Sequence, residues 1–429
     1  MAAINPASDL ATANGIAKKV EGKIVKLQPR RMYKTINRIK YEDKVGANFN
    51  EFVWLTEEHG FTFGGTSGGK RTLNESEVAE GSEATLTPSE IDFRTEVTIG
   101  LLSRARQKGE KAYDKFVTQM MLNSRIAFDK RLEVLTLYGG SPLATVSSAT
   151  DAGTSSVITL QSKTFAPGIW RKSRNMAIDA YDGATLLNDE ADLNVTAVTM
   201  DVGGDAYTVT VSGEATDITA LAGASNPTLY YKGQKGNDFT GLYTIGNLST
   251  GSYLGISATT YSDVWQGSQV TWTYGDDLTW NHIQDLLEEM ASRGAEGDII
   301  LATSMAGWND LNASLTALKV LDSTYSVERA DVGHSVSGIR FHGVTGSVLV
   351  EPNEFVKRGD AIAYPDPSDK ADQEVIAKRI GSSNITMQIP GKDGEMFHML
   401  ENTNTFEKRA YTDQALWLPA PCSCGVLTS

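Results

Sequence analysis

The stretch EKAYDKFVTQMMLNSRIAFDKRLEVLTLYGG, residues 110–140, carries apolar residues at helical spacing along its whole length. Charged side chains fill the opposite face, which is the pattern of a helix with one buried side. The pair Gly139-Gly140 ends the pattern. We predict one helix of about 28 residues, a rod of roughly 40 Å at about 1.5 Å per residue. A helix of this length typically forms the backbone of a fold rather than a site.

The segment before this helix, residues 60–100, has the character of a long two-stranded excursion. It begins with GFTFGGTSGGKRT at residues 60–72, continues through an acidic stretch, and ends with the strand-like alternation of TEVTIGLL. Few of its residues are large and apolar, so it cannot pack a core of its own. An excursion of this kind is usually functional or reaches a partner, and its glycines indicate a flexible loop tip.

The same loop offers an alternative interpretation, because Gly64, Gly69 and Lys70 have the spacing of a phosphate-binding GxxxxGK loop. That loop needs a Ser or Thr after the Lys for magnesium, and a helix whose N-terminus faces the phosphates. Here Arg71 follows Lys70, and the next residues, LNESEVAEGSEATLTPSE, have no helical period. They are also acidic, which disfavours a triphosphate. A nucleotide-binding enzyme using Gly64–Lys70 is therefore the less favoured alternative.

Charge is distributed unevenly along the chain, whose formal net charge is −14. Residues 18–44 hold ten Lys or Arg against three acidic residues, with apolar residues between them. Residues 178–275 hold two Lys against eleven acidic residues. We interpret the first segment as a basic arm that lies along another surface, and the second as an acidic subdomain.

The segment after the long helix changes from β to α/β character. Residues 155–275 are rich in strands, and NVTAVTM and YTVTVS flank a glycine-containing turn in a hairpin pattern. From Asp276 onward a helix, the buried strand GDIILAT, a second helix capped by Ser304, and the strand pair GIRFHGVTGSVLVEP follow. The segments NITMQIP and EMFHML flank GKDG and predict a last hairpin. The fold class is therefore α+β.

Several functional classes are excluded or disfavoured by what the sequence contains. No run of 18 uninterrupted apolar residues is present, which disfavours a membrane span, and the N-terminus lacks the pattern of a secretory signal. The two cysteines, Cys422 and Cys424, form neither a disulfide framework nor a paired zinc motif, and the five histidines are scattered. Arg358-Gly359-Asp360 is interpreted as a turn before the strand AIAY. No acid–base or nucleophile constellation stands out, so we expect no enzyme activity, cofactor or metal.

Taken in order, these parts resemble the major capsid proteins of tailed double-stranded DNA bacteriophages, the Hong Kong 97-like fold. The resemblance spans nearly the whole chain, but it depends on the order of the expected elements and on their sequence character rather than on a short motif. It implies an N-terminal arm, a hairpin called the E-loop, a spine helix, a peripheral β domain, an axial α/β domain and an inserted β-subdomain. The implied ranges are 1–58 for the arm, 59–102 for the E-loop, 103–177 for the first peripheral part with the spine helix, 178–275 for the insertion, 276–370 for the axial domain, and 371–429 for the second peripheral part and C-terminus.

The resemblance also implies a function: self-assembly of hexamers and pentamers into an icosahedral virion shell, built in the host cytoplasm. Such a shell encloses double-stranded DNA without sequence-specific binding, contacts a portal protein and no membrane, and in some members carries a decoration protein. The 58 residues before the E-loop are too few for a fused scaffold, so we expect a separate scaffolding protein and no trimming. An encapsulin-like compartment is the main alternative. The expected inter-subunit contacts are Lys18, Lys19, Arg30, Arg31, Lys34, Gly64, Gly65, Gly68, Gly69, Lys70 and Arg71.

Overall fold

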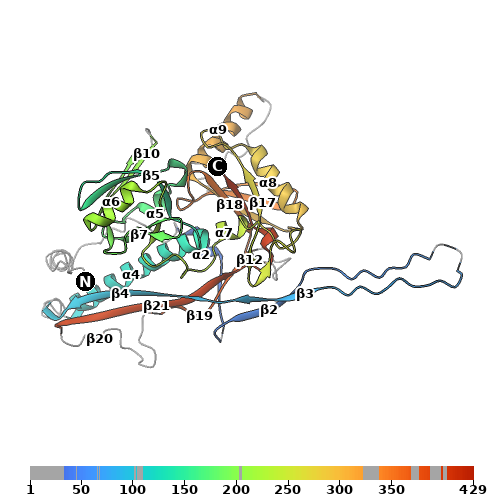
Figure 1. The fold of residues 1–429 in the computed structure, drawn as a ribbon, viewed down its shortest axis with the longest axis horizontal. Coiled ribbons are helices and arrows are strands. Elements are labelled where there is room, and N and C mark those ends of the chain that lie inside the picture. The colour runs from blue at the N-terminus through green and yellow to red at the C-terminus, as the bar shows by residue number, and fades with distance from the viewer. Residues whose placement is uncertain are drawn as a thin grey trace.

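The computed structural model describes residues 33–44, 46–64, 66, 68–100, 103, 110–201, 205–321, 338–368, 376–386, 398–399 and 403–429. In Figure 1 a two-lobed body lies above a long sheet, and one thin hairpin projects far beyond the body. The predicted long helix is confirmed as α4, Glu110–Tyr138. It ends where expected because the chain crosses another segment closely there: a Cβ on Gly139 would lie 2.1 Å from the carbonyl oxygen of Phe239.

The long sheet lies along α4 and is built from segments far apart in sequence. Strands β4 (Ser89–Thr98) and β21 (Thr405–Trp417) pair antiparallel over ten residues, from Thr405 opposite Thr98 to Gln414 opposite Ser89. The other edge of β21 pairs with β19 (Lys378–Thr386) and β20 (His398–Met399), and β19 in turn pairs with β1 (Tyr41–Asp43). The sheet and the helix meet at the rings of Phe93 and Phe128, whose centroids are 5.8 Å apart.

Of the last predicted hairpin, the turn GKDG and most of NITMQIP and EMFHML lie outside the described residues, so this hairpin stays a prediction. Strands β19 and β20 do not pair with each other but lie end to end along one edge of β21, opposite β4. The physical reason is the length of β21: its 13 residues offer enough unpaired backbone for both short strands. Local sequence shows that two strands are present but not which third strand they prefer.

The β-rich lobe is a closed antiparallel barrel. The strand order β11-β5-β6-β10-β9-β7 closes because β11 pairs with β7 as well as with β5, and β8 extends β7 at the margin. The predicted hairpin around residues 201–206 is confirmed as β9 and β10. In β6 and β10 alternate residues are buried in the interior, as is typical of small barrels. The strands are β5 (Ala144–Ala149), β6 (Ser155–Leu160), β7 (Ala177–Asp182), β8 (Thr185–Leu186), β9 (Leu193–Asp201), β10 (Ala206–Ser212) and β11 (Thr228–Tyr231).

The barrel therefore begins before residue 178, the expected start of the insertion, since β5 and β6 are part of it. The segment after β11 leaves the barrel and joins the second lobe. Helix α6 packs on β5 and β6 through Ile218 and Leu221, both fully buried. The remaining short elements of this region are η2 (Ser162–Thr164), α5 (Pro167–Trp170), α6 (Ala215–Gly223), α7 (Leu242–Gly246), β12 (Ser252–Tyr253) and β13 (Ile256–Ser257).

The second lobe is a six-stranded mixed sheet in the order β14-β22-β18-β15-β17-β16, with α8 and α9. The expected strand GDIILAT is confirmed as β15, whose five residues are all buried, and Ser304 caps α9 by accepting the N–H of Gly307 at 3.1 Å. The C-terminal strand β22 lies in this sheet rather than in the peripheral part expected for residues 371–429. The elements are β14 (Ser268–Thr271), α8 (Trp280–Ser292), β15 (Ile299–Thr303), α9 (Met305–Leu321), β16 (Ile339–His342), β17 (Ser347–Pro352), β18 (Asp360–Pro365), η3 (Pro421–Ser423) and β22 (Gly425–Thr428).

A buried carboxylate on α4 fixes the short helix α2 (Lys34–Arg38) in the body. Glu133 is fully buried and accepts the backbone N–H groups of Thr35 at 3.0 Å and Ile36 at 2.8 Å. No side chain of α2 itself caps these groups, so Glu133 supplies the cap from a distant segment. The amide of Asn353, which follows β17, donates to the same carboxylate at 3.2 Å. One side chain thus joins the arm, the long helix and the second lobe.

The opposite end of α2 is held by a cation. Arg379 of β19 donates from Nη2 to the carbonyl of Ile36 at 3.3 Å and from Nε to the carbonyl of Ile39 at 3.2 Å. Its Nη1 donates to the side chain of Gln414 on β21 at 2.9 Å. An anion at the N-terminus and a cation at the C-terminus both suit the helix dipole, so α2 bridges the long helix and the long sheet.

We expect Glu133→Ala to lower the free energy of unfolding by at least about 3 kcal/mol, because it orphans three buried donors at about 1–3 kcal/mol each. Urea unfolding followed by circular dichroism measures this. The matched control is Glu288→Ala on the exposed face of α8, which should change stability by less than about 0.5 kcal/mol. Equal effects of the two substitutions would contradict the role assigned to Glu133.

A second cluster joins the end of α4 to β18. The hydroxyl of Tyr138 donates to Oδ2 of Asp360 at 2.9 Å and accepts the backbone N–H of Lys357 at 2.9 Å. The ammonium of Lys357 donates to the carbonyl of Pro142 at 2.8 Å, and Arg358 pairs with Asp205 at 3.1 Å. The charged residues of the Arg-Gly-Asp tripeptide are thus engaged inside the subunit, and the expected turn before a strand is confirmed by β18. Loss of solvent contact raises the pKa of Asp360 to about 6.

This cluster predicts a pH dependence of stability. The pKa of Asp360 lies above its ordinary value of 3.8. The contribution of Asp360 to the free energy of unfolding is therefore full below about pH 4 and is lost as the pH rises through about 6. Asp360→Asn cannot titrate. The variant should therefore gain about 2–3 kcal/mol relative to the native chain between pH 4 and pH 7. Urea titrations at several pH values test this, and a constant difference would count against the buried carboxyl.

Candidate inter-subunit contact site

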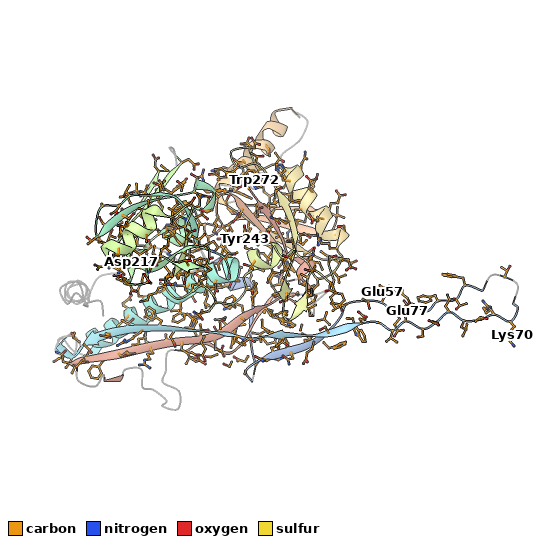
Figure 2. All side chains as sticks on the ribbon, viewed as in Figure 1. Glu57, Lys70, Glu77, Asp217, Tyr243 and Trp272 are labelled. Carbon is orange, nitrogen blue, oxygen red and sulfur yellow. The ribbon has the colours of Figure 1, made fainter. Side chains whose placement is uncertain are left out.

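The projecting hairpin is formed by β2 (Phe49–Trp54) and β3 (Gly81–Leu86), which pair from Phe49 opposite Leu86 to Trp54 opposite Gly81. Beyond the strands the two chains stay together. Leu55 donates its N–H to the carbonyl of Glu80 at 2.9 Å, and a further bridge links His59 and Glu77. Figure 2 shows Glu57 and Glu77 on the outer part of the hairpin and Lys70 at its far end. The paired strands begin at residue 49, inside the range expected for the arm.

Only the root of the hairpin packs against the body. Ala84 and Leu86 are buried, and the ring of Phe49 meets Trp417 of β21 edge to face at 4.6 Å. The other face of the same strands carries Phe52 and Trp54, which contact each other but remain more than half exposed. The hairpin is therefore anchored on one face and open to a partner on the other.

The glycine-rich tip has the properties of a turn and not of a phosphate-binding loop. Gly68 has φ +57°, a backbone conformation that other residues adopt at a cost, and Gly69 has open space where a Cβ would stand. The guanidinium of Arg71 lies directly over Gly64. Residues 68–80 contain no helix, so no helix N-terminus follows the loop to meet a phosphate. Lys70 is exposed at the tip.

The apolar residues of the hairpin are the part of the site that sequence reasoning missed. Phe61 is 74% exposed, Phe63 95% and Leu73 74%. If the register of the His59–Glu77 bridge continues, Phe63 stands opposite Leu73 and on the same face as Phe61. The alternation in GFTF was the available signal, but the same alternation is typical of a strand that buries one face in its own core. Of the ten large apolar side chains exposed in the described residues, six lie on this hairpin.

The predicted contacts of the basic arm lie mostly outside the described residues. Lys18, Lys19, Arg30 and Arg31 belong to residues 1–32, and Gly65 is also undescribed. Lys34 is described and makes contacts within the subunit: it donates to the carbonyl of Pro352 at 2.7 Å and lies 3.8 Å from Glu351. Its role between subunits stays a prediction.

The described residues offer little for other kinds of site. They contain no group of three or more His, Cys, Asp or Glu side chains placed to hold a metal ion. Their helices include none with the length and apolarity needed to cross a membrane. Cys422 and Cys424 are both buried, and burial raises the pKa of each thiol, which keeps them unreactive.

No protein-family model and no curated protein matches the sequence. Solved structures do match in shape. The capsid asymmetric unit of Cyanophage A-1(L) superposes with a TM-score of 0.50 at 12% identity, over 95% of this chain and 94% of that one. The capsid of a native GTA particle superposes with a TM-score of 0.47 at 8% identity, over 95% of this chain and 93% of that one. An encapsulin complex from Synechococcus elongatus superposes with a TM-score of 0.41 at 7% identity, over 96% of this chain and 94% of that one.

The cyanophage comparison bears on the fold alone, because 12% identity is too low to carry a function. The superposition spans both chains almost completely. The same order of parts was expected from the sequence: hairpin, spine helix, β-rich lobe, α/β lobe and closing strands. This chain therefore has the Hong Kong 97-like fold of phage capsid proteins.

Proposed function

We propose that this chain is a major capsid protein that self-assembles through hexamers and pentamers into an icosahedral shell around double-stranded viral DNA. The observation that carries the proposal is the hairpin. It holds most of the exposed large apolar side chains of the described residues, yet it projects away from the body (Figure 1). Apolar surface of this kind in a soluble protein marks an interaction site. On a capsid-like fold, the fitting partner is another copy of the chain.

The rigidity of the body and the net charge of the chain support the same proposal. The hydrogen bonds of Glu133 and Arg379 to α2, together with the closed barrel, give each subunit a fixed shape, which suits a closed assembly of identical units. One subunit touches several neighbours, so weak individual contacts combine into a stable shell. The net charge of −14 disfavours tight binding of DNA to the protein, which suits a container filled by a separate machine. A portal protein, a scaffolding protein and the virion location belong to this proposal, as does the absence of catalysis.

Electron microscopy of the purified chain at increasing concentration tests the proposal. We expect rings of five or six subunits, or closed shells, to form as the concentration rises. A monomer that stays monodisperse at every concentration, with its hairpin exposed, would argue against a shell protein. Particles that form around a protein cargo and contain no nucleic acid in the native host would favour the encapsulin-like alternative instead.

We further expect that replacing residues 61–75 by a two-glycine link abolishes assembly and leaves the subunit folded. None of the removed residues that are described belongs to a hydrophobic core, and the His59–Glu77 bridge can close the shortened hairpin. The midpoint of thermal unfolding should change by no more than a few degrees. Shortened subunits that still form shells, or that no longer unfold cooperatively, would both disagree with this division of roles.

A further inference from the structure

Four neighbouring strands of the barrel carry almost no charge. Strands β5, β6, β10 and β9 contain one charged residue, Asp201, which is the last residue of β9. The opposite part of the barrel differs, because the short strand β7 alone carries Asp179 and Asp182. In a chain with a net charge of −14, an extended neutral surface is where a second acidic molecule can approach without repulsion.

The pairing of these strands places hydroxyl side chains in one row across the outside of the barrel. The directly opposed residues of this row are Ser148 of β5, Thr159 of β6, Thr208 of β10 and Thr199 of β9. Opposed residues of antiparallel strands lie on the same side of the sheet. The next residues along two of the strands, Ile158 and Val209, are fully buried in the barrel, so the four hydroxyl groups lie on the outer side.

Two further rows extend this surface. In one row Val157 stands opposite Thr210, which stands opposite Ala197, and in the other Ser155 stands opposite Ser212, which stands opposite Asn194. Val157 is 43% exposed, although most large apolar side chains exposed among the described residues lie on the hairpin. The three rows together are called the hydroxyl face. At the usual spacing of strands and residues it covers roughly 400 Å².

The hydroxyl groups of the first row have no hydrogen-bond partner among the described residues. Other exposed threonines of this lobe are engaged: Thr196 donates to the carbonyl of Thr210 at 3.1 Å, and Thr219 donates to Asp151 at 2.8 Å. A hydroxyl group both donates and accepts, so two identical rows of hydroxyl groups can bond to each other. Two identical rows of carboxylates or of ammonium groups would repel. The hydroxyl face is therefore complementary to itself.

The hydroxyl face lies on the barrel wall that is turned away from the long helix. In the closed ring of strands, β6 and β10 stand opposite β7 and β11. Strand β11 is the one that meets α4, since the guanidinium of Arg131 lies 3.3 Å from the ring centroid of Tyr231. Figure 1 shows β5 and β10 on the side of this lobe away from α4 and from the projecting hairpin. The face is thus free for a contact separate from the hairpin.

We propose that the hydroxyl face binds the same face of a second copy of this chain about a two-fold axis. A self-complementary surface suits such an isologous contact, in which each residue patch meets its own copy. Roughly 800 Å² buried by both copies is below the size of a stable interface, so the contact acts together with others. This inference rests on the proposed function, because it names a further surface at which the subunits of the shell meet.

Single cysteines test the contact, because identical positions of two copies come close together only near a two-fold axis. The variants Ser148→Cys, Val157→Cys, Thr199→Cys and Thr210→Cys are made one at a time, and both native cysteines are buried and should not compete. Under mild oxidation of assembled protein, at least one variant should give a covalent dimer on denaturing gels. The control, Thr185→Cys on the exposed margin of the barrel, should give at least tenfold less dimer.

The outcomes separate this inference from the proposed function. Normal particles in which no variant gives more dimer than the control would overturn the contact and leave the capsid proposal standing. Dimers from concentrated protein that never forms particles would support the contact and overturn the capsid proposal. Protein that forms neither particles nor dimers would overturn both.

A charge test addresses the same contact without cysteines. Thr208→Glu with Thr210→Glu places like charges on both copies and should raise the concentration needed for assembly at least tenfold at low salt. Lysines at the same two positions should have the same effect. A mixture of the two folded variants, confirmed as folded by circular dichroism, should recover assembly because unlike charges then meet. Unimpaired assembly of either variant alone, or a mixture that does not recover, would contradict a contact of this face with itself.

Discussion

The buried carboxylate of Glu133 is the constraint on which the arrangement of the body depends. A carboxylate without water is stable only when hydrogen-bond donors surround it, and here the donors come from α2 and from the residue after β17. Burial raises the pKa of Glu133, whereas these hydrogen bonds lower it. Arg379 completes the arrangement from β19. If any of these segments shifts, a buried charge or donor loses its partner, so the segments hold one another in a single geometry.

This geometry gives the two parts of the molecule different tasks. The body buries its apolar residues in two clusters, and six strands of its β-rich lobe close into a ring in which each pairs with two neighbours. The hairpin does the opposite, because beyond its root it exposes Phe61, Phe63 and Leu73. Stability therefore resides in the body, whereas in the proposed shell the association of subunits depends on the hairpin. The ladder of β4 and β21 connects them, since the chain passes from β3 directly into β4.

Sequence alone predicted the parts that depend on neighbours along the chain. The period of residues 110–138 and the two glycines after them defined α4, and the turn residues at 201–206 defined the β9–β10 hairpin. Sequence analysis did not predict pairings between distant segments. Strands β19 and β20 both pair with β21, and β22 pairs with β18 in the second lobe. In the candidate site, the glycine-rich loop around Gly68 and Lys70 was predicted because glycine favours a turn, and its role between subunits stays a prediction. Phe61 and Phe63 were missed because an aromatic residue that faces a partner has the same sequence pattern as one that faces a core.

Hydrogen–deuterium exchange of the free subunit and of the assembled particle tests the central claim most directly. If the hairpin joins subunits, the amides of residues 60–73 exchange rapidly in the free subunit, where most of the described ones are exposed, and become strongly protected in the particle. The amides of Thr35 and Ile36, held by Glu133, should be protected in both states. Equal, rapid exchange of residues 60–73 in free and assembled protein would show that the shell is joined elsewhere and would contradict the role assigned to the hairpin.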